Sequence, residues 1–220
     1  MKKLDFLDHI SYSNISSFEF CPRCWLLHYK YDIDLPIPKS WKLGTEVHEA
    51  IENYHLKRTI PDRNDPAYPF LVAYSQAYTS KDYDKIELLL EVPVIHPFKK
   101  TKLPLPIQMR IDRIHKGWIH DVKTSSKKWT FEDTDGRTQT AIYAYGYRQH
   151  YGKQEKGIVY DVLLKRKKPQ HEPLPTYADD MMIKESLLWL WKGYEKIVNR
   201  LAAGEPDTHS KRCWRKGLLP

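Results

Sequence analysis

The chain has 220 residues, enough for one sizeable hydrophobic core, and its 36 lysines and arginines exceed its 28 aspartates and glutamates, which gives a formal charge of +8. No stretch approaches the roughly 20 apolar residues that a membrane-spanning helix needs. The excess of basic residues suits a polyanionic partner such as nucleic acid.

The N-terminal residues and the cysteines bear on location. The first residues lead into Asp5 and Asp8 rather than into the apolar region of a signal peptide. Three cysteines, an odd number, give no disulfide framework, and free thiols are ordinary in a reducing compartment. We therefore expect a cytoplasmic protein.

Before residue 80 the apolar spacing is mainly helical. The expected segments are a helix over 11–31 with a break at Cys21-Pro22, a connector over 32–40, a helix over 44–56, a loop over 61–69 and a short helix over 70–78. Val47, Ile51 and Tyr54 fall at i, i+4 and i+7, so they share one buried face of the second helix, with His48 at its margin.

After residue 80 the period changes to that of strands. The expected segments are strands over 86–95, 105–114 and 118–122, a helix over 137–150, a strand over 157–164 and a helix over 181–201. Turn-like residues at 96–103 and 115–117 favour an antiparallel meander of the first three strands. This order predicts an α/β fold in which helices cover a mixed sheet.

Two acidic residues and a lysine are placed to share a site. Asp121 and Lys123 flank Val122 on one strand, so their side chains lie on the same face. Asp112 ends the preceding strand and can meet Asp121 if the two strands pair. Carboxylate oxygens suit Mg²⁺ or Mn²⁺, and a bound divalent ion would offset the repulsion between the two carboxylates.

Such a site supports attack of water on a phosphodiester bond. The metal would polarise a phosphoryl oxygen and lower the pKa of a bound water. Lys123 would orient that water, or help to deprotonate it if its own pKa were lowered. The alternative is a solvated strand with a cross-strand salt bridge, because short acid-x-Lys strings are frequent by chance.

Several strings occur in order around this site. They are Ser13-Asn14-Ile15, Cys21-Pro22-Arg23, Gly44-Thr45-Glu46-Val47-His48-Glu49, Ile111-Asp112-Arg113, Ile119-His120-Asp121-Val122-Lys123-Thr124-Ser125, Gln139 with Tyr143, and Tyr160-Asp161-Val162-Leu163 ending in Lys165. Together they resemble the PD-(D/E)XK nuclease superfamily, in particular its RecB-like branch, which includes CRISPR-associated exonucleases. The resemblance covers most of the chain.

The resemblance implies roles for individual residues. The implied metal ligands are His48, Asp112, Asp121 and the backbone carbonyl of Val122, and the implied catalytic residues are Asp112, Asp121, Lys123, Gln139 and Tyr143. Gln139 and Tyr143 stand at i and i+4 and so point the same way on a helix. Without the resemblance they would be a polar surface residue and a core tyrosine, and His48 a partly buried histidine. The resemblance implies that Glu91 is the family's glutamate on the strand before Asp112; Glu87 competes with it, and the alternative is that either glutamate is simply solvated.

The resemblance also implies a fold and an activity. The fold is a restriction-endonuclease-like α/β/α core, in a single domain over 1–220 with a mainly helical part over 1–80, a catalytic core over 81–170 and a C-terminal helix and basic tail over 171–220. The activity is a Mg²⁺- or Mn²⁺-dependent DNA exonuclease, acting on duplex ends or single strands in recombination, repair or phage-linked or CRISPR-linked end processing. The implied setting is a bacterial, archaeal or phage-infected host cell, with a recombination or repair protein as partner.

The chain departs from the family at two places. Met109 stands where the family usually has glycine, three residues before the aspartate, which leaves the direction of cleavage open. Some relatives bind an iron-sulfur cluster through one N-terminal and three C-terminal cysteines, but here the only cysteines are Cys21, Cys24 and Cys213. A four-cysteine cluster cannot be built from them, so we expect no iron-sulfur cluster.

A smaller metal site is an alternative for these cysteines. Cys21-x-x-Cys24 and His209-x-x-x-Cys213 would form a Cys3His zinc site if the two ends of the chain met. Because so long a separation is not a recognised zinc spacing, we favour three unligated cysteines and a surface histidine.

Basic and aromatic residues interleave at three places. They are Lys127, Lys128, Trp129 and Phe131, then 165–168, then Lys211, Arg212, Arg215 and Lys216. We expect Lys127, Lys128 and Trp129 to contact DNA because they follow the catalytic strand. The alternative is a solvated charged face with Trp129 in the core.

Three other functions are alternatives for this sequence. His48-Glu49-Ala50-Ile51-Glu52 comes within one residue of the His-Glu-x-x-His string of zinc peptidases, but Glu52 replaces the second histidine. A non-catalytic nucleic-acid-binding module would use the same basic and aromatic residues. A structure-selective endonuclease would use the same site.

Overall fold

A computed structural model describes residues 1–134, 137–211 and 213, apart from the side chain of Ser40. Its helices and strands are α1 (Tyr12–Phe20), α2 (Pro22–Tyr29), α3 (Lys39–Leu56), α4 (Tyr68–Ser75), β1 (Lys85–Val92), β2 (Ile107–His115), β3 (Trp118–Ser125), α5 (Phe131–Thr134), α6 (Thr138–Tyr151), β4 (Gly157–Leu164), β5 (Gln170–Thr176) and α7 (Asp180–Ala202). None of the helices in these described residues has the length and apolar character of a membrane span.

Contacts along the chain divide it into two compact units. The first unit comprises Met1–Pro36, Glu91–Met109 and Asp180–Pro220, and the second comprises Ile37–Leu90 and Arg110–Asp179. Two of the four crossings of the chain between these units fall within β1 and β2. The expected metal ligands, catalytic residues and DNA-contacting residues all belong to the second unit, whereas Glu91 belongs to the first.

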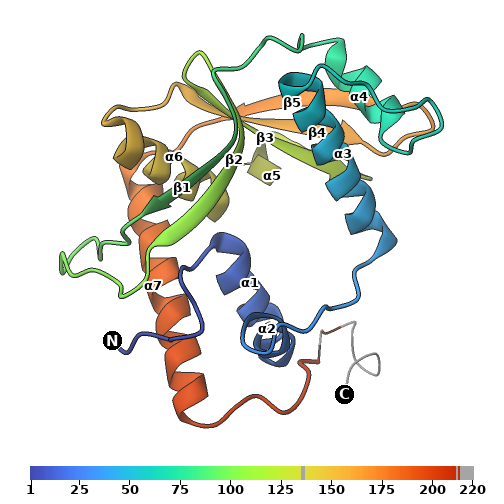
Figure 1. The fold of residues 1–220 in the computed structure, drawn as a ribbon. Coiled ribbons are helices and arrows are strands. Elements are labelled where there is room, and N and C mark those ends of the chain that lie inside the picture. Colours follow the sequence, from blue (N-terminus) through green and yellow to red (C-terminus); the bar gives the residue numbers. More distant parts are fainter. Residues whose placement is uncertain (135–136, 212, 214–220) are drawn as a thin grey trace. The chain divides into compact units, whose positions relative to one another are not determined.

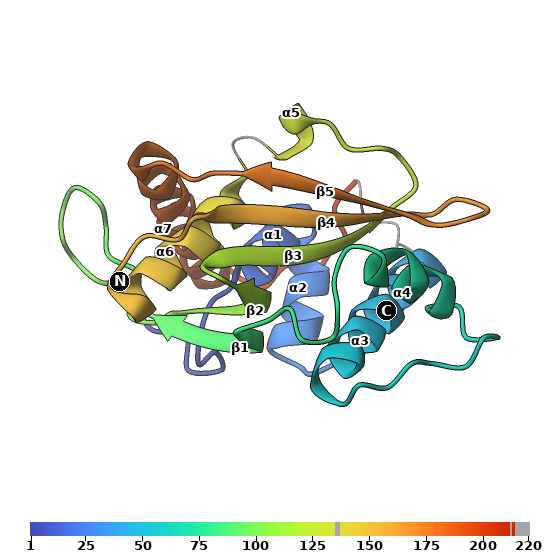
Figure 2. The same cartoon turned by 90° about the horizontal axis from the view of Figure 1, so that it is seen from above.

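The strands form a mixed sheet in the order β1-β2-β3-β4-β5 (Figures 1 and 2). β2 and β3 run antiparallel through the turn at Lys116 and Gly117, as predicted. β3 and β4 run parallel, and α6 is the crossover helix that such a pair requires. The predicted mixed α/β sheet is thus confirmed.

The last strand, β5, was not predicted. It pairs antiparallel with β4 over its whole length, although Pro173 and Pro175 lie within it. Proline has no backbone N–H, so it is confined to the edges of sheets. Here β5 is the edge strand, where prolines are accepted, and these prolines explain why the segment has no clear strand pattern.

In the first unit, α1 and α2 are separated at Cys21, where the break was predicted. Cys21 has extended backbone angles, and Pro22 occupies the first turn of α2, where its missing N–H costs no helical hydrogen bond. α1 packs closely on α7: a Cβ atom added at Gly193 would lie 2.3 Å from Ile15 Cγ2. Glycine is therefore required at this helix crossing.

In the second unit, helices lie on both faces of the sheet. α3 and α4 pack through Val47 and Tyr74 against Val122 of β3 and Leu163 of β4. α6 packs on β4, where Thr140 Oγ1 lies 2.7 Å from Tyr160 Oη. The arrangement is the predicted α/β/α core. α3 begins at Lys39, five residues before the predicted start, and shortens the expected connector.

A buried polar network in the second unit centres on Asp161 of β4, with partners from β2, β3, β5 and the segment after α4. Asp161 is fully buried. Its Oδ1 lies 2.9 Å from His171 Nε2 and accepts a hydrogen bond from Tyr78 Oη at 3.0 Å. Its Oδ2 lies 2.9 Å from His120 Nδ1 and 3.4 Å from Arg113 Nη2. Burial alone would raise the pKa of Asp161, but the histidine hydrogen bonds and the Arg113 charge hold that pKa well below its usual range. Arg113, itself 2% exposed, depends on this carboxylate for its counter-charge.

We expect Asp161→Asn to lower the free energy of unfolding by about 3 kcal/mol or more, because it leaves the Arg113 guanidinium buried without its counter-charge. Since the folded-state pKa of Asp161 is depressed, its contribution is present above the ordinary pKa of 3.8 and is lost as the pH falls below it. The difference between variant and parent should therefore shrink in denaturant titrations below that pH. The exposed Asp34→Asn serves as control; a loss no larger than that of the control at neutral pH would contradict this account of the network.

Candidate active site

Two carboxylates lie where β2 and β3 separate. The last β2–β3 pair on this side is Arg113↔His120, and the next residue of each strand is an aspartate. Beyond this pair the Val122 N–H donates to Asp112 Oδ2 at 2.7 Å, so a side chain replaces a backbone partner. Asp121, 1% exposed, receives a hydrogen bond at Oδ1 from Tyr143 Oη at 3.1 Å. The structure thus brings the two predicted carboxylates to one site.

The predicted lysine joins them. Lys123 Nζ lies 2.5 Å from Asp121 Oδ2, as expected for residues two apart on one strand. Burial would lower the pKa of Lys123, but the charges of Asp121 and Asp112 raise it above the usual value. Lys123 is therefore an ammonium ion at neutral pH. This favours its orienting and charge-stabilising role over the alternative of a general base, which needs a lowered pKa.

The pair of carboxylates is electrostatically costly. Burial, followed by the charge of Asp121, raises the pKa of Asp112 from 3.8 to about 7. His48 and Lys123 oppose this shift but do not cancel it. A site that holds one carboxylate partly protonated at neutral pH lacks positive charge, which a divalent cation would supply.

A void of about 10 Å³ lies beside Asp112, which is about the room that one water-sized particle needs. Its lining includes His48, Glu52, Glu87 and Asp112. His48 Nδ1 is 3.4 Å from Asp112 Oδ2, so α3 delivers its histidine to the carboxylates as predicted. Imidazole and carboxylate donors around a void of this size fit a divalent cation.

Two of these residues were not assigned to the site from the sequence. Glu52 lies one helical turn after His48, so the i, i+4 spacing on α3 was an available signal. Glu87 was the competitor of Glu91 for the strand position. Burial, and then the charge of Glu52, raises the pKa of Glu87, whereas Glu91 accepts a hydrogen bond from Gln108 Nε2 at 2.8 Å in the first unit.

Glu87 has an unusual backbone conformation. Its φ of +49° lies in the left-handed region, which a non-glycine residue seldom adopts within a strand. Such conformations cost roughly 1–3 kcal/mol and concentrate at functional sites. The conformation places the Glu87 side chain at the void next to Asp112, and it interrupts the simple alternation on which sequence assignment depends.

Helix α6 supplies a second contact to the carboxylates. Gln139 Nε2 donates to Tyr143 Oη at 2.9 Å, and Tyr143 in turn donates to Asp121. Burial, then the charges of Asp121 and Asp112, raises the pKa of Tyr143 well above its usual value, so the phenol keeps its proton. The predicted pair on α6 therefore stands beside Asp121.

The predicted DNA-contacting residues differ in exposure. Lys127 pairs with Asp133 at 2.9 Å, and Lys128 pairs with Glu172 at 3.1 Å; both lysine side chains remain about 70% exposed. Trp129 is only 9% exposed, packs on Tyr160, and has the Arg137 guanidinium 4.1 Å from its ring centroid. Its placement matches the alternative of a core tryptophan. Of the basic tail, Lys211 is exposed, and Arg212, Arg215 and Lys216 lie outside the described residues.

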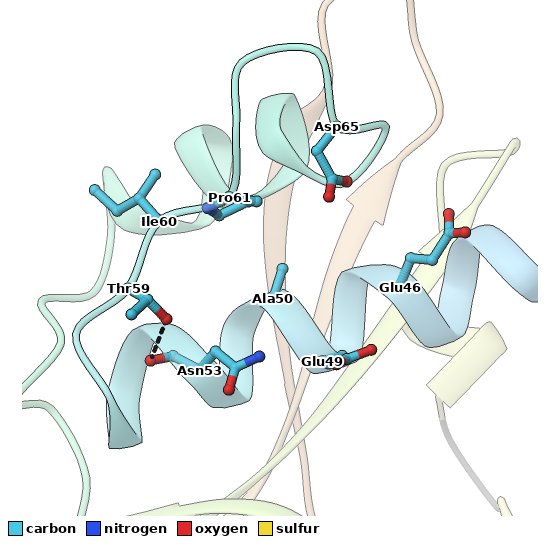
Figure 3. Close-up of a pocket in the computed structure, with 8 residues that line it drawn as sticks. All are labelled: Glu46, Glu49, Ala50, Asn53, Thr59, Ile60, Pro61 and Asp65. Carbon is cyan, nitrogen blue, oxygen red and sulfur yellow. Dashed lines mark hydrogen bonds between the residues drawn. The ribbon is translucent and has the colours of Figure 1, made fainter.

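A separate hollow of about 250 Å³ lies along α3 (Figure 3). Its lining residues are Glu46, Glu49, Ala50, Asn53, Thr59, Ile60, Pro61 and Asp65. The α3 residues among them fall on a different side of the helix from His48 and Glu52, and no residue lines both spaces. This hollow is therefore distinct from the carboxylate site.

Comparisons with known proteins agree with this geometry. The solved structure described as "Putative exonuclease" from Eubacterium rectale aligns with a TM-score of 0.64 at 13% identity, covering 100% of this chain and 95% of that one, which shows a shared fold. A second structure, SSO0001, has a TM-score of 0.48 at 15% identity, covering 94% of this chain and 81% of that one. No curated protein matches the chain.

The sequence pattern of one family matches residues 9–216, nearly the whole chain. That family is described as the PD-(D/E)XK nuclease superfamily, whose members act on phosphodiester bonds. With the predicted α/β core and the two aspartates and lysine gathered at one site, the chain belongs to the PD-(D/E)XK nuclease superfamily.

Proposed function

We propose that this protein is a Mg²⁺- or Mn²⁺-dependent deoxyribonuclease that removes nucleotides from DNA ends. The observation that carries the proposal is the buried pair Asp112 and Asp121, with Lys123 paired to Asp121 and a void with room for one ion beside Asp112. Hard oxygen ligands favour Mg²⁺ or Mn²⁺ over softer metals.

Each residue of the site has a proposed role. Asp112, Asp121, His48 and the Val122 carbonyl would hold the metal, and Glu87 would join them from β1. A bound metal supplies Lewis acidity at a phosphoryl oxygen and a water of lowered pKa. The Lys123 ammonium, held by Asp121, stabilises negative charge that develops on the phosphate. Tyr143 and Gln139 fix the Asp121 carboxylate from α6.

The choice of DNA and of exonuclease action rests on charge and on the similar solved structure. A net charge of +8 suits a polyanion, and exposed Lys127 and Lys128 would contact its phosphates. The similar structure described as "Putative exonuclease" favours attack at ends. We place the protein in the RecB-like branch, in the cytoplasm, in DNA recombination, repair or end processing with a partner protein of such a pathway. The alternatives are a structure-selective endonuclease and a non-catalytic DNA-binding module.

The direct test uses linear DNA labelled at its 5′ or 3′ end and a covalently closed circle of the same sequence, each incubated with Mg²⁺ or Mn²⁺. We expect the linear DNA to be degraded and the circle to stay intact, and we expect Asp121→Asn and Lys123→Ala to slow cleavage by about 10³-fold or more.

The exposed Asp34→Asn should cleave at the parent rate, and circular dichroism checks that each variant is folded. Because a closed circle has no ends, its cleavage would show endonuclease action and would contradict the exonuclease assignment. Equal activity of Asp121→Asn and parent would rule out the proposed site. If neither metal supported cleavage of single-stranded, nicked or linear DNA, the nuclease proposal would be ruled out and the non-catalytic DNA-binding module would be the alternative that fits.

The two competing glutamates give a matched pair of variants. Glu87→Gln removes a charge from the void beside Asp112, so we expect the Mg²⁺ concentration for half-maximal cleavage to rise about tenfold. Glu91→Gln keeps the partner Gln108 within reach and should leave this concentration unchanged. Metal titrations of the cleavage rate measure both, and the reverse ranking would assign the ligand to Glu91.

A further inference from the structure

A second cluster of metal-binding side chains lies in the first unit, which the nuclease site does not use. Cys21 stands at the break between α1 and α2, and Cys24 lies in the first turn of α2. His209 and Cys213 follow α7 near the other end of the chain. The expectation of unligated cysteines rested on the long separation of the two pairs in the sequence. In the fold the two pairs lie together.

The four donor atoms all lie within 4.8 Å of one another. Cys24 Sγ is 3.3 Å from Cys213 Sγ. His209 Nδ1 is 3.4 Å from Cys24 Sγ and 3.7 Å from both Cys21 Sγ and Cys213 Sγ. One imidazole nitrogen thus faces three sulfur atoms at nearly equal distances.

The four separations of 3.3–3.7 Å are close to the edges of a tetrahedron around one ion. Zn–S bonds of about 2.3 Å and a Zn–N bond of about 2.0 Å give edges of roughly 3.5–3.8 Å. A multinuclear iron-sulfur cluster places iron and sulfide between its ligands and needs them farther apart. The geometry points to a structural Zn²⁺ held by Cys21, Cys24, His209 and Cys213, and we propose this site for the protein.

The surrounding structure holds the two halves of the site in place. Ser210 Oγ donates to the Phe20 carbonyl at 2.7 Å, which ties the residue after His209 to the residue before Cys21. The Cys213 N–H donates to the Ser210 carbonyl at 3.0 Å and so turns Cys213 back toward the cluster. Tyr31 Oη donates to Glu205 Oε2 at 2.6 Å beyond α2. The approach of the two segments therefore has supports other than the sulfur contacts.

The donor set also argues against the alternatives. The three cysteines are all buried and reduced, and an odd number cannot pair fully as disulfides. Three thiolates and one neutral imidazole complete four-coordination, which leaves no open position for water or substrate, so the role is structural. On binding, each thiol proton passes to solvent as a Zn–S bond forms. The ion would join residues 21 and 24 to residues 209 and 213 within the first unit.

Metal analysis of the full-length protein, purified under reducing conditions without chelator, tests the site. We expect one zinc per chain, with loss of most of that zinc in Cys24→Ser and in His209→Ala. His28→Ala, an exposed histidine of α2, and Asp121→Asn in the nuclease site should both keep it. The second control separates this metal from any at the catalytic carboxylates.

Cobalt substitution keeps the test decisive if a cysteine variant fails to fold. The parent protein, stripped of metal and loaded with Co²⁺, should show thiolate-to-cobalt charge transfer and the visible bands of tetrahedral cobalt, and one equivalent of Zn²⁺ should abolish both. A folded protein with neither zinc nor this spectrum would overturn the proposal. So would iron with acid-labile sulfide, or zinc that Asp121→Asn removes and Cys24→Ser retains.

Discussion

The active site depends on the burial of two like charges side by side. Asp112 and Asp121 meet where β2 and β3 part, and there burial, together with the Asp121 charge, raises the pKa of Asp112 to about 7. Lys123 balances part of this charge through Asp121. The arrangement is stable as a pair of ionised carboxylates only with further positive charge, and a metal-dependent phosphodiester hydrolase requires such a site.

The surrounding fold is arranged to maintain this pair. β3 brings Asp121 and Lys123 to one face of the sheet, and α6 fixes Asp121 through Tyr143. Asp161 of β4 neutralises Arg113 of β2, the residue that follows Asp112. Protein groups thus balance the charge of Asp161, whereas the charges of Asp112 and Asp121 are only partly balanced. This difference in charge balance distinguishes the structural role of Asp161 from the metal-binding role proposed for Asp112 and Asp121.

Sequence periodicity was sufficient for the features that depend on local geometry. The alternation of a strand placed Asp121 beside Lys123, and the helical repeat placed Gln139 beside Tyr143. Features set by long-range packing or by local exceptions were missed. The prolines of β5 hid an edge strand. Glu87 and Glu91 share the parity of one strand, so alternation could not choose between them, and the left-handed backbone of Glu87 has no signature in the residue itself. The meeting of Cys24 with Cys213 required the tertiary fold.

Calorimetric titration of Mn²⁺ into the metal-free full-length protein tests the central claim about the buried pair most directly. We expect saturable binding that is lost in the Asp112→Asn, Asp121→Asn double variant. Because the Asp112 proton must leave before the carboxylate can bind metal, binding should release more protons below neutral pH than well above it, as buffers of different ionisation enthalpy would reveal. Equal Mn²⁺ binding by the double variant and the parent, or no binding by the folded parent, would contradict the account.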